Sequence, residues 1–172
     1  MSNCEITQGF TLGCFGASGI EKAYVATYEA GASWELDADD QISGATMTNQ
    51  FYELEMDAEY AGVEQTITGS RENASTFFET NVSLKFANLD KELIKLVKTM
   101  AKAPMTLVLK SNSGEWFVAG VESAGRTLEG TLSAGVLLGD LNGSTLVVNY
   151  RSANGIYSID PTVAETLVTP TP

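Results

Sequence analysis

The side chains of this sequence that could do chemistry are mostly carboxylates, and they are concentrated in one part of the chain. Positions 23–70 hold ten acidic residues and no lysine or arginine. Two carboxylates at a suitable separation can act as acid and base in glycoside hydrolysis, and several together can bind calcium through their oxygens. Both kinds of chemistry depend on how the chain spaces these groups.

Four of the carboxylates alternate with apolar residues in the segment 51–60. Successive side chains of a strand point to opposite faces, so the alternation predicts a strand with one acidic and one apolar face. The acidic face would carry Glu53, Glu55, Asp57 and Glu59, and the apolar face Tyr52, Leu54, Met56, Ala58 and Tyr60. Neighbouring carboxylates would lie about 6.5–7 Å apart and face water. The row is either the solvated face of an antiparallel sheet or a wall that repels a negatively charged partner.

A hydrolytic enzyme would use two carboxylates of this row, because inverting glycosidases separate theirs by about 6.5–9.5 Å. That chemistry requires one carboxylic acid with a raised pKa, and a flat, hydrated row gives no physical cause for such a shift. The chain also has no histidine, the commonest general base. We therefore expect no catalytic site and no cofactor.

A second acidic cluster, in the predicted loop 30–40, suggests a calcium site. It consists of Glu35, Asp37, Asp39 and Asp40. Its spacing lacks the glycine and the terminal glutamate of an EF-hand loop. We expect a solvated acidic loop and no metal site.

The two cysteines, Cys4 and Cys14, are ten residues apart and form no Cys-x-x-Cys pair. Without histidine, this pattern does not support a zinc site. A disulfide between them and two reduced thiols are both open, and the thiols are favoured in a reducing compartment.

Composition and charge limit the class of protein. The chain has 172 residues, of which 44% are hydrophobic, which suits one globular domain with a core. A net charge of −12 disfavours attraction to nucleic-acid phosphates. The first residues lack the features of a secretory signal, and no apolar run reaches the roughly 18 residues of a membrane span. We expect synthesis in a cytoplasm.

The remaining pattern predicts a mainly β fold, a sandwich or barrel of antiparallel strands. A glycine-rich arm occupies residues 1–20, the β domain 21–151 and a C-terminal extension 152–172. Within the extension, residues 160–172 hold three of the four prolines and lack periodicity, so we expect a tail that is mobile or orders on a partner. Segment 63–69 would pair back along 51–60 in a long hairpin with a turn at Ala61-Gly62. Other strands are predicted at 22–29, 42–48, 76–87, 105–110, 115–122, 125–131 and 144–150.

One flanking helix is predicted at about 89–102, because apolar residues recur there at helical spacing. Asn88 or Asp90 can cap its start, and Pro104 follows its end. The polar positions carry Lys91, Lys95, Lys98 and Lys102. This basic face is either solvated or a docking surface for an acidic neighbour, such as another copy of the chain.

The order of elements resembles that of bacteriophage tail-tube proteins and the related ring-forming tube proteins of contractile injection systems. The resemblance covers roughly residues 20–150. Its elements are the acidic strand, the helix and the strand meander, and the stretches that carry it are Ser70-Arg71-Glu72-Asn73, Thr76-Phe77-Phe78, Gly114-Glu115-Trp116-Phe117-Val118-Ala119-Gly120 and residues 135–146.

The resemblance implies a virion structural protein, assembled in the host cytoplasm, that forms homo-oligomeric rings. The rings would be hexameric and would stack into a tail tube through which DNA passes without specific binding. Glu53, Glu55, Asp57 and Glu59 would then face the lumen, and the lysines of the helix would contact another subunit. The partners would be other copies of the chain and other virion tail or neck proteins, and no membrane. The alternatives are a neck-ring or tail-completion protein of the same fold, and a calcium- or carbohydrate-binding module, which Trp34, Trp116 and the acidic loop support.

Overall fold

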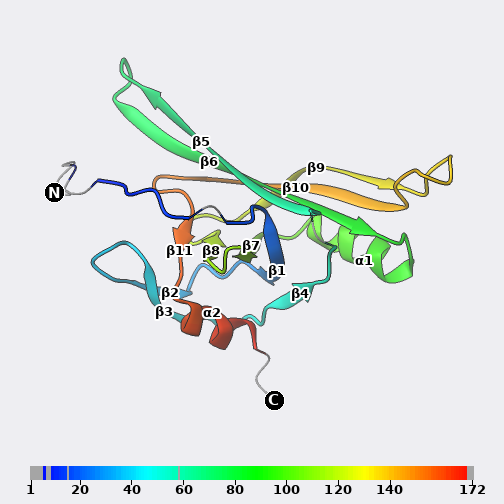
Figure 1. Cartoon of the computed structure of the whole chain (residues 1–172), viewed down its shortest axis with the longest axis horizontal. Coiled ribbons are helices and arrows are strands. Elements are labelled where there is room, and N and C mark those ends of the chain that lie inside the picture. Colours follow the sequence, from blue (N-terminus) through cyan, green and yellow to red (C-terminus); the bar gives the residue numbers. More distant parts are fainter. Residues whose placement is uncertain (1–5, 7–8, 15, 58, 170–172) are drawn as a thin grey trace.

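A computed structural model describes residues 6, 9–14, 16–57 and 59–169 of the chain. The fold is mainly β with antiparallel sheets and flanking helices, as the sequence predicts (Figure 1). Its strands are β1 (Ile20–Thr27), β2 (Ser33–Leu36), β3 (Ile42–Thr46), β4 (Tyr52–Leu54), β5 (Ala61–Ser70), β6 (Ser75–Ala87), β7 (Met105–Ser111), β8 (Trp116–Ala119), β9 (Arg126–Ser133), β10 (Gly143–Ser152) and β11 (Tyr157–Ser158). Its helices are α1 (Lys91–Met100) and α2 (Pro161–Val168). Neither helix is long and apolar enough to cross a membrane.

The middle layer is a five-stranded sheet in the order β11-β8-β7-β1-β4. Strand β7 lies at its centre and is buried on both faces, so it is a continuous apolar run and does not alternate. Met105, Leu107 and Leu109 point into one core, and Val108 points into the other.

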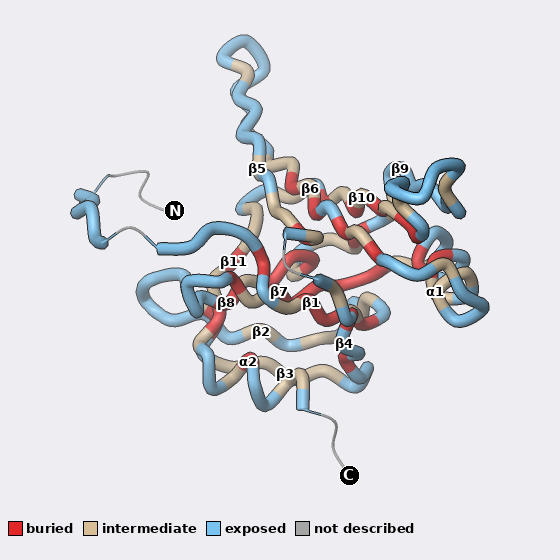
Figure 2. The backbone as a smooth tube through the Cα atoms, turned by 45° about the vertical axis from the view of Figure 1, so that its right-hand side comes forward, coloured by how far each residue is buried: buried red, intermediate tan, exposed pale blue. Residues whose placement is uncertain are grey.

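The first core lies between this sheet and a four-stranded sheet in the order β5-β6-β10-β9, with α1 at one end. Val82 and Leu84 of β6 pack there beside Leu146 and Val148 of β10. The alternate residues of these strands form the outer face of the four-stranded sheet, which is mainly polar and only partly buried. Buried and less buried positions alternate along β6 and β10 (Figure 2). The described part of the chain does not cover this face.

The second core lies on the opposite face of the five-stranded sheet, under the β2–β3 hairpin and α2. Ile42 and Ile159 are fully buried there, next to Ala164 of α2. Tyr24 stacks on Trp116 with ring centroids 6.0 Å apart. The central sheet therefore has apolar layers on both sides.

The predicted strand 51–60 and its hairpin with 63–69 are wrong. Strand β4 has only three residues and pairs with β1, and Tyr52 is exposed while Phe51 is buried. A turn follows, in which the Tyr60 N–H donates to the carbonyl of Asp57 and Glu59 has a φ of 69°. Here the chain passes from the five-stranded to the four-stranded sheet, so no single strand can continue through it. The long hairpin is β5–β6, which turns at residues 71–74.

The C-terminal extension also differs from the prediction, because residues 152–169 complete the second core. Strand β10 reaches Ser152, β11 joins the five-stranded sheet, and α2 packs on β3. Asp160 caps α2 by accepting from the Thr162 N–H, and Pro161 occupies the first turn.

Helix α1 is confirmed over Lys91–Met100, with Asp90 as its N-cap. In the N-terminal arm, the described residues before Ile20 are exposed and form neither helix nor strand. Cys14 is exposed, whereas Cys4 lies outside the described residues, so the disulfide stays open.

Gly125 lies against the ring of buried Tyr150 and offers a test of the first core. A Cβ at Gly125 would fall 2.2 Å from two ring carbons of Tyr150. We expect Gly125→Ala to lower the free energy of unfolding by about 1–3 kcal/mol, because a packed interior resists added volume. Urea unfolding measures this, and Gly139→Ala is the control because a Cβ there meets nothing within 4 Å. Equal stability of the two variants would contradict this packing.

The second core makes α2 necessary for stability. Ala164 is 0% exposed, whereas Glu165 of the same helix is exposed. Ala164→Glu is expected to destabilise the whole domain by at least about 2 kcal/mol, because it buries a carboxylate without a partner. Glu165→Ala serves as the control and is expected to stay within about 0.5 kcal/mol of the parent protein. A mobile tail would leave both variants as stable as the parent.

Candidate functional site

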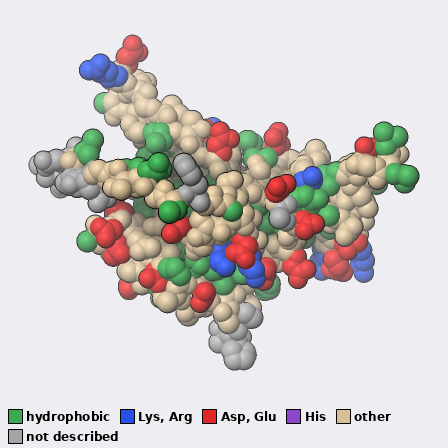
Figure 3. Space-filling view, viewed as in Figure 1, with side chains coloured by type: hydrophobic (Ala, Val, Ile, Leu, Met, Phe, Trp, Pro, Cys, Tyr) green, Lys and Arg blue, Asp and Glu red, His purple; other side chains and the backbone are tan. Residues whose placement is uncertain are grey.

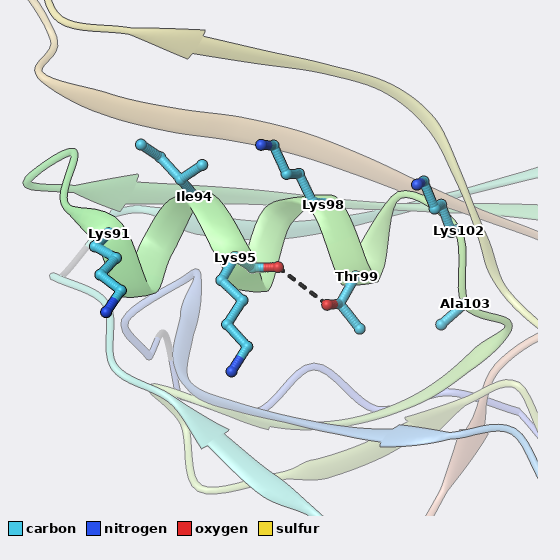
Figure 4. A pocket seen from close by; sticks show the side chains of 7 residues that line it. All are labelled: Lys91, Ile94, Lys95, Lys98, Thr99, Lys102 and Ala103. Carbon is cyan, nitrogen blue, oxygen red and sulfur yellow. Dashed lines mark hydrogen bonds between the residues drawn. The ribbon is translucent and has the colours of Figure 1, made fainter.

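The lysine stripe, defined as Lys91, Lys95, Lys98 and Lys102, is the first candidate surface. The inner side of α1 buries Val97 and Met100, and this leaves all four lysines exposed. Lys91 and Lys95 extend to one side of the helix, and Lys98 and Lys102 to the other (Figure 4). With Ile94, Thr99 and Ala103, they line a shallow groove of about 640 Å³.

These lysines make no ion pair in the described part of the chain. The three ion pairs there join Lys22 to Glu53, Lys110 to Glu21 and Arg151 to Glu79. The stripe holds four of the ten basic residues of a chain whose net charge is −12. It is thus a concentrated positive surface on a strongly acidic molecule.

The acidic cleft, the second candidate surface, lies beside the N-terminus of the same helix. Five carboxylates line it: Glu53, Glu55, Asp57, Asp90 and Glu92. Its volume is about 750 Å³, and its apolar lining consists of Leu54, Met56, Phe86, Ala87, Leu93 and Leu96. No lysine or arginine is among the residues that line it.

The four carboxylates of the predicted row are all exposed, but they do not form a row. Only Glu53 lies in a strand, where it pairs with Tyr24 on the face of the second core. The Lys22 ammonium lies 3.2 Å from Glu53, and the hydrogen bond between them raises the pKa of Lys22. Glu55 and Asp57 belong to the loop that follows, and Glu59 does not line the cleft.

The outer face of the four-stranded sheet carries a polar network that the sequence pattern does not reveal. The Asn149 amide donates to Glu79 at 2.9 Å and to Asn81 at 2.8 Å, and the Arg151 guanidinium donates to Glu79 at 3.0 Å. The bond from Asn149, followed by that from Arg151, lowers the pKa of Glu79. These residues are about 70 positions apart in sequence, so only the register of β6 on β10 brings them together.

The acidic residues of the predicted loop 30–40 lie on and between β2 and β3. The Asp37 carboxylate accepts the N–H groups of Asp39 and Gln41 at 2.9 and 3.0 Å, which closes the turn. Across the described residues, no three histidine, cysteine, aspartate or glutamate side chains are placed to hold a metal ion.

No family model matches the chain, and the comparisons with curated proteins and with solved structures find no match either. The features of the molecule that bear on its function are the lysine stripe, the acidic cleft, the polar outer face of the four-stranded sheet and the edges of the sheets.

The exposure of the lysine stripe leads to a test of the isolated chain. Lys95→Gln/Lys98→Gln is expected to change the free energy of unfolding by no more than about 0.5 kcal/mol, because neither lysine is buried or ion-paired in the described chain. Val97→Ala, on the buried side of the same helix, is expected to cost about 2 kcal/mol. Thermal unfolding at low protein concentration measures both. A large loss in the glutamine variant would show that the lysines serve the fold.

Proposed function

We propose that this chain is a virion structural protein that forms homo-oligomeric rings, hexameric as in the family it resembles, which stack into a phage tail tube. The observation that carries the proposal is the pair of open edges of the four-stranded sheet. DNA passes through the tube without specific binding.

Strands β5 and β9 are these edges, with ten and eight residues. In the described chain each pairs with a neighbour on one side only, β5 with β6 and β9 with β10. An unpaired edge of this length presents a row of N–H and C=O groups to other chains, and proteins normally cover or shorten it. Pairing with another copy satisfies these groups.

The strand directions suit such pairing. Each of the four strands is antiparallel to its neighbours in the order β5-β6-β10-β9, so the two edge strands, β5 and β9, run in opposite directions. Copies related by rotation about an axis along the strands therefore bring β9 of one antiparallel to β5 of the next. Because the two edges are different surfaces, the contact is heterologous and repeats until a ring closes, which leaves no open edge.

The bulk of the domain lies on one side of this sheet, so the polar face is the one that fits the smaller inner circumference of a ring. The register places Glu64, Glu79, Glu129, Lys85, Arg126 and Arg151 on that face. Their charges balance, so a wall built from them has no positive excess to hold DNA phosphates. Glu53 belongs to β4 of the five-stranded sheet, so it does not lie on this face of the four-stranded sheet.

The two hairpin ends of the sheet project at opposite ends of the molecule (Figure 1). The β5–β6 end carries Arg71 and Glu72. The β9–β10 end exposes Val136, Leu137 and Leu138, and the Asp140 carboxylate holds it by accepting two backbone N–H groups at 2.8 and 2.9 Å. Apolar side chains also gather at one projecting end in the space-filling view (Figure 3). An exposed apolar end of this kind suits contact with a stacked ring.

Electron microscopy of the purified protein tests the proposal, together with Thr66→Pro and Ile67→Pro in β5. Successive N–H groups of a strand point to opposite sides, so one of these two points away from β6. Proline there is expected to preserve the fold and abolish rings, because edge strands tolerate proline but lose a donor. Proline at the other position breaks a bond to β6 and is expected to destabilise the hairpin.

Thr66→Ala is the control and is expected to assemble like the parent. Tubes from the parent protein, lost in the folded proline variant, support the proposal. Rings that never stack would favour the neck-ring alternative. The proposal would be refuted if the parent protein formed no rings. It would also be refuted if Thr66→Pro and Ile67→Pro were both folded and both still formed rings.

A further inference from the structure

We infer that the lysine stripe of one copy docks in the acidic cleft of a second copy. This inference rests on the proposed function in one respect, because it names a contact between subunits of the same assembly. It differs from the pairing of sheet edges, since it uses α1 and the segment after β4.

The two surfaces are complementary in charge. The stripe presents four lysines without an ion pair in the described chain, and the cleft gathers five carboxylates, of which only Glu53 has a basic partner there. Complementary potentials of this kind steer association and fix the register of a contact.

The surfaces also match in apolar character. The cleft lies between α1 and the segment after β4, and Met56, Leu93 and Leu96 form part of its lining. The aliphatic stems of the lysines, with half-buried Ile94 between them, can cover these apolar groups while the ammonium groups reach the carboxylates.

A second copy is favoured over nucleic acid as the occupant of the stripe. DNA would meet a molecule with a net charge of −12, whose cleft lies beside the stripe and repels phosphates. A second copy brings the same net charge but offers a local concentration of carboxylates. Close packing of such acidic subunits needs a local attraction to offset their repulsion, and the stripe holds four of the ten basic residues of the chain.

The contact joins two different surfaces. A docked pair therefore either leaves one stripe and one cleft for further copies, or forms a reciprocal dimer in which the stripe of each copy occupies the cleft of the other. Either arrangement contains the same contact. Charge reversal of each surface, alone and in combination, therefore tests the contact whatever the symmetry of the assembly.

The experiment uses two double variants of the full chain and sedimentation velocity at low ionic strength. Lys95→Glu/Lys98→Glu reverses the stripe, and Glu55→Lys/Asp57→Lys reverses the cleft. Neither changes the cap residue Asp90 or the paired Glu53. Each variant alone is expected to associate at least about tenfold more weakly than the parent, because like charges then face each other. Their equimolar mixture is expected to regain association, since each reversed surface meets a complementary one.

The mixture is informative because both variants remain acidic. Each reversed residue changes the charge by two, so the net charges become −16 and −8 from the parent's −12. General attraction between oppositely charged proteins therefore does not explain a rescue. Asp39→Lys/Glu115→Lys is the matched control: it also has a net charge of −8, its changed residues are exposed and lie outside the cleft, and it is expected to associate as strongly as the parent. Circular dichroism verifies that every variant is folded.

The outcomes separate this inference from the proposed function. If the parent forms rings and both reversed variants form them equally well, the docking is wrong and the rings stand. If the parent forms only small oligomers that respond to reversal and to rescue, the docking stands and the tube is wrong. A parent that stays monomeric refutes both. Binding of duplex DNA by the parent, lost on reversal of the stripe, would assign the stripe to nucleic acid and overturn the docking.

Discussion

The structure depends on the burial of β7 on both faces. This strand forms hydrogen bonds with β1 and β8 at its sides, and its side chains enter two separate cores above and below. Each apolar layer covers what would otherwise be an exposed hydrophobic face of the central sheet. The four-stranded sheet with α1 and the β2–β3 hairpin with α2 are held in place because they cover these faces.

The same layering decides which surfaces are left for other molecules. The four-stranded sheet uses its inner face for the first core, so its polar face and both of its edge strands stay open in the described chain. Helix α1 uses Val97 and Met100 for that core and presents its lysines outward. The packing of the four-stranded sheet and α1 onto the first core therefore leaves three features exposed: the edge strands β5 and β9, the lysine stripe and one wall of the acidic cleft. These surfaces therefore have a common origin in the packing of the first core.

The charges of the molecule are separated in space more than the composition suggests. On the polar face, Glu79 is bonded to Arg151 and Asn149, so the acids and bases there largely compensate one another. Around α1 they do not, because the basic groups lie along the helix and the acidic groups lie at its start and in the segment after β4. Charge of both signs is therefore kept apart by one helix and, apart from Glu53, is not neutralised within the described chain.

The sequence by itself determined the elements whose pattern is local. The lysine stripe follows from the period of 3.6 residues, β6 follows from an alternation of period two, and β7 and β10 follow from compact runs of apolar and β-branched residues. The Asp160-Pro161 start and the apolar stripe of α2 were also present as signals, but the prolines of the last residues favour a tail instead. Only the tertiary structure decided the fate of residues 51–60, the partner of each strand and the cleft between Asp57 and Asp90. A period of two fixes which side chains share a face but carries no information on where a strand leaves its sheet, because that point is set by contacts with residues far away in the sequence.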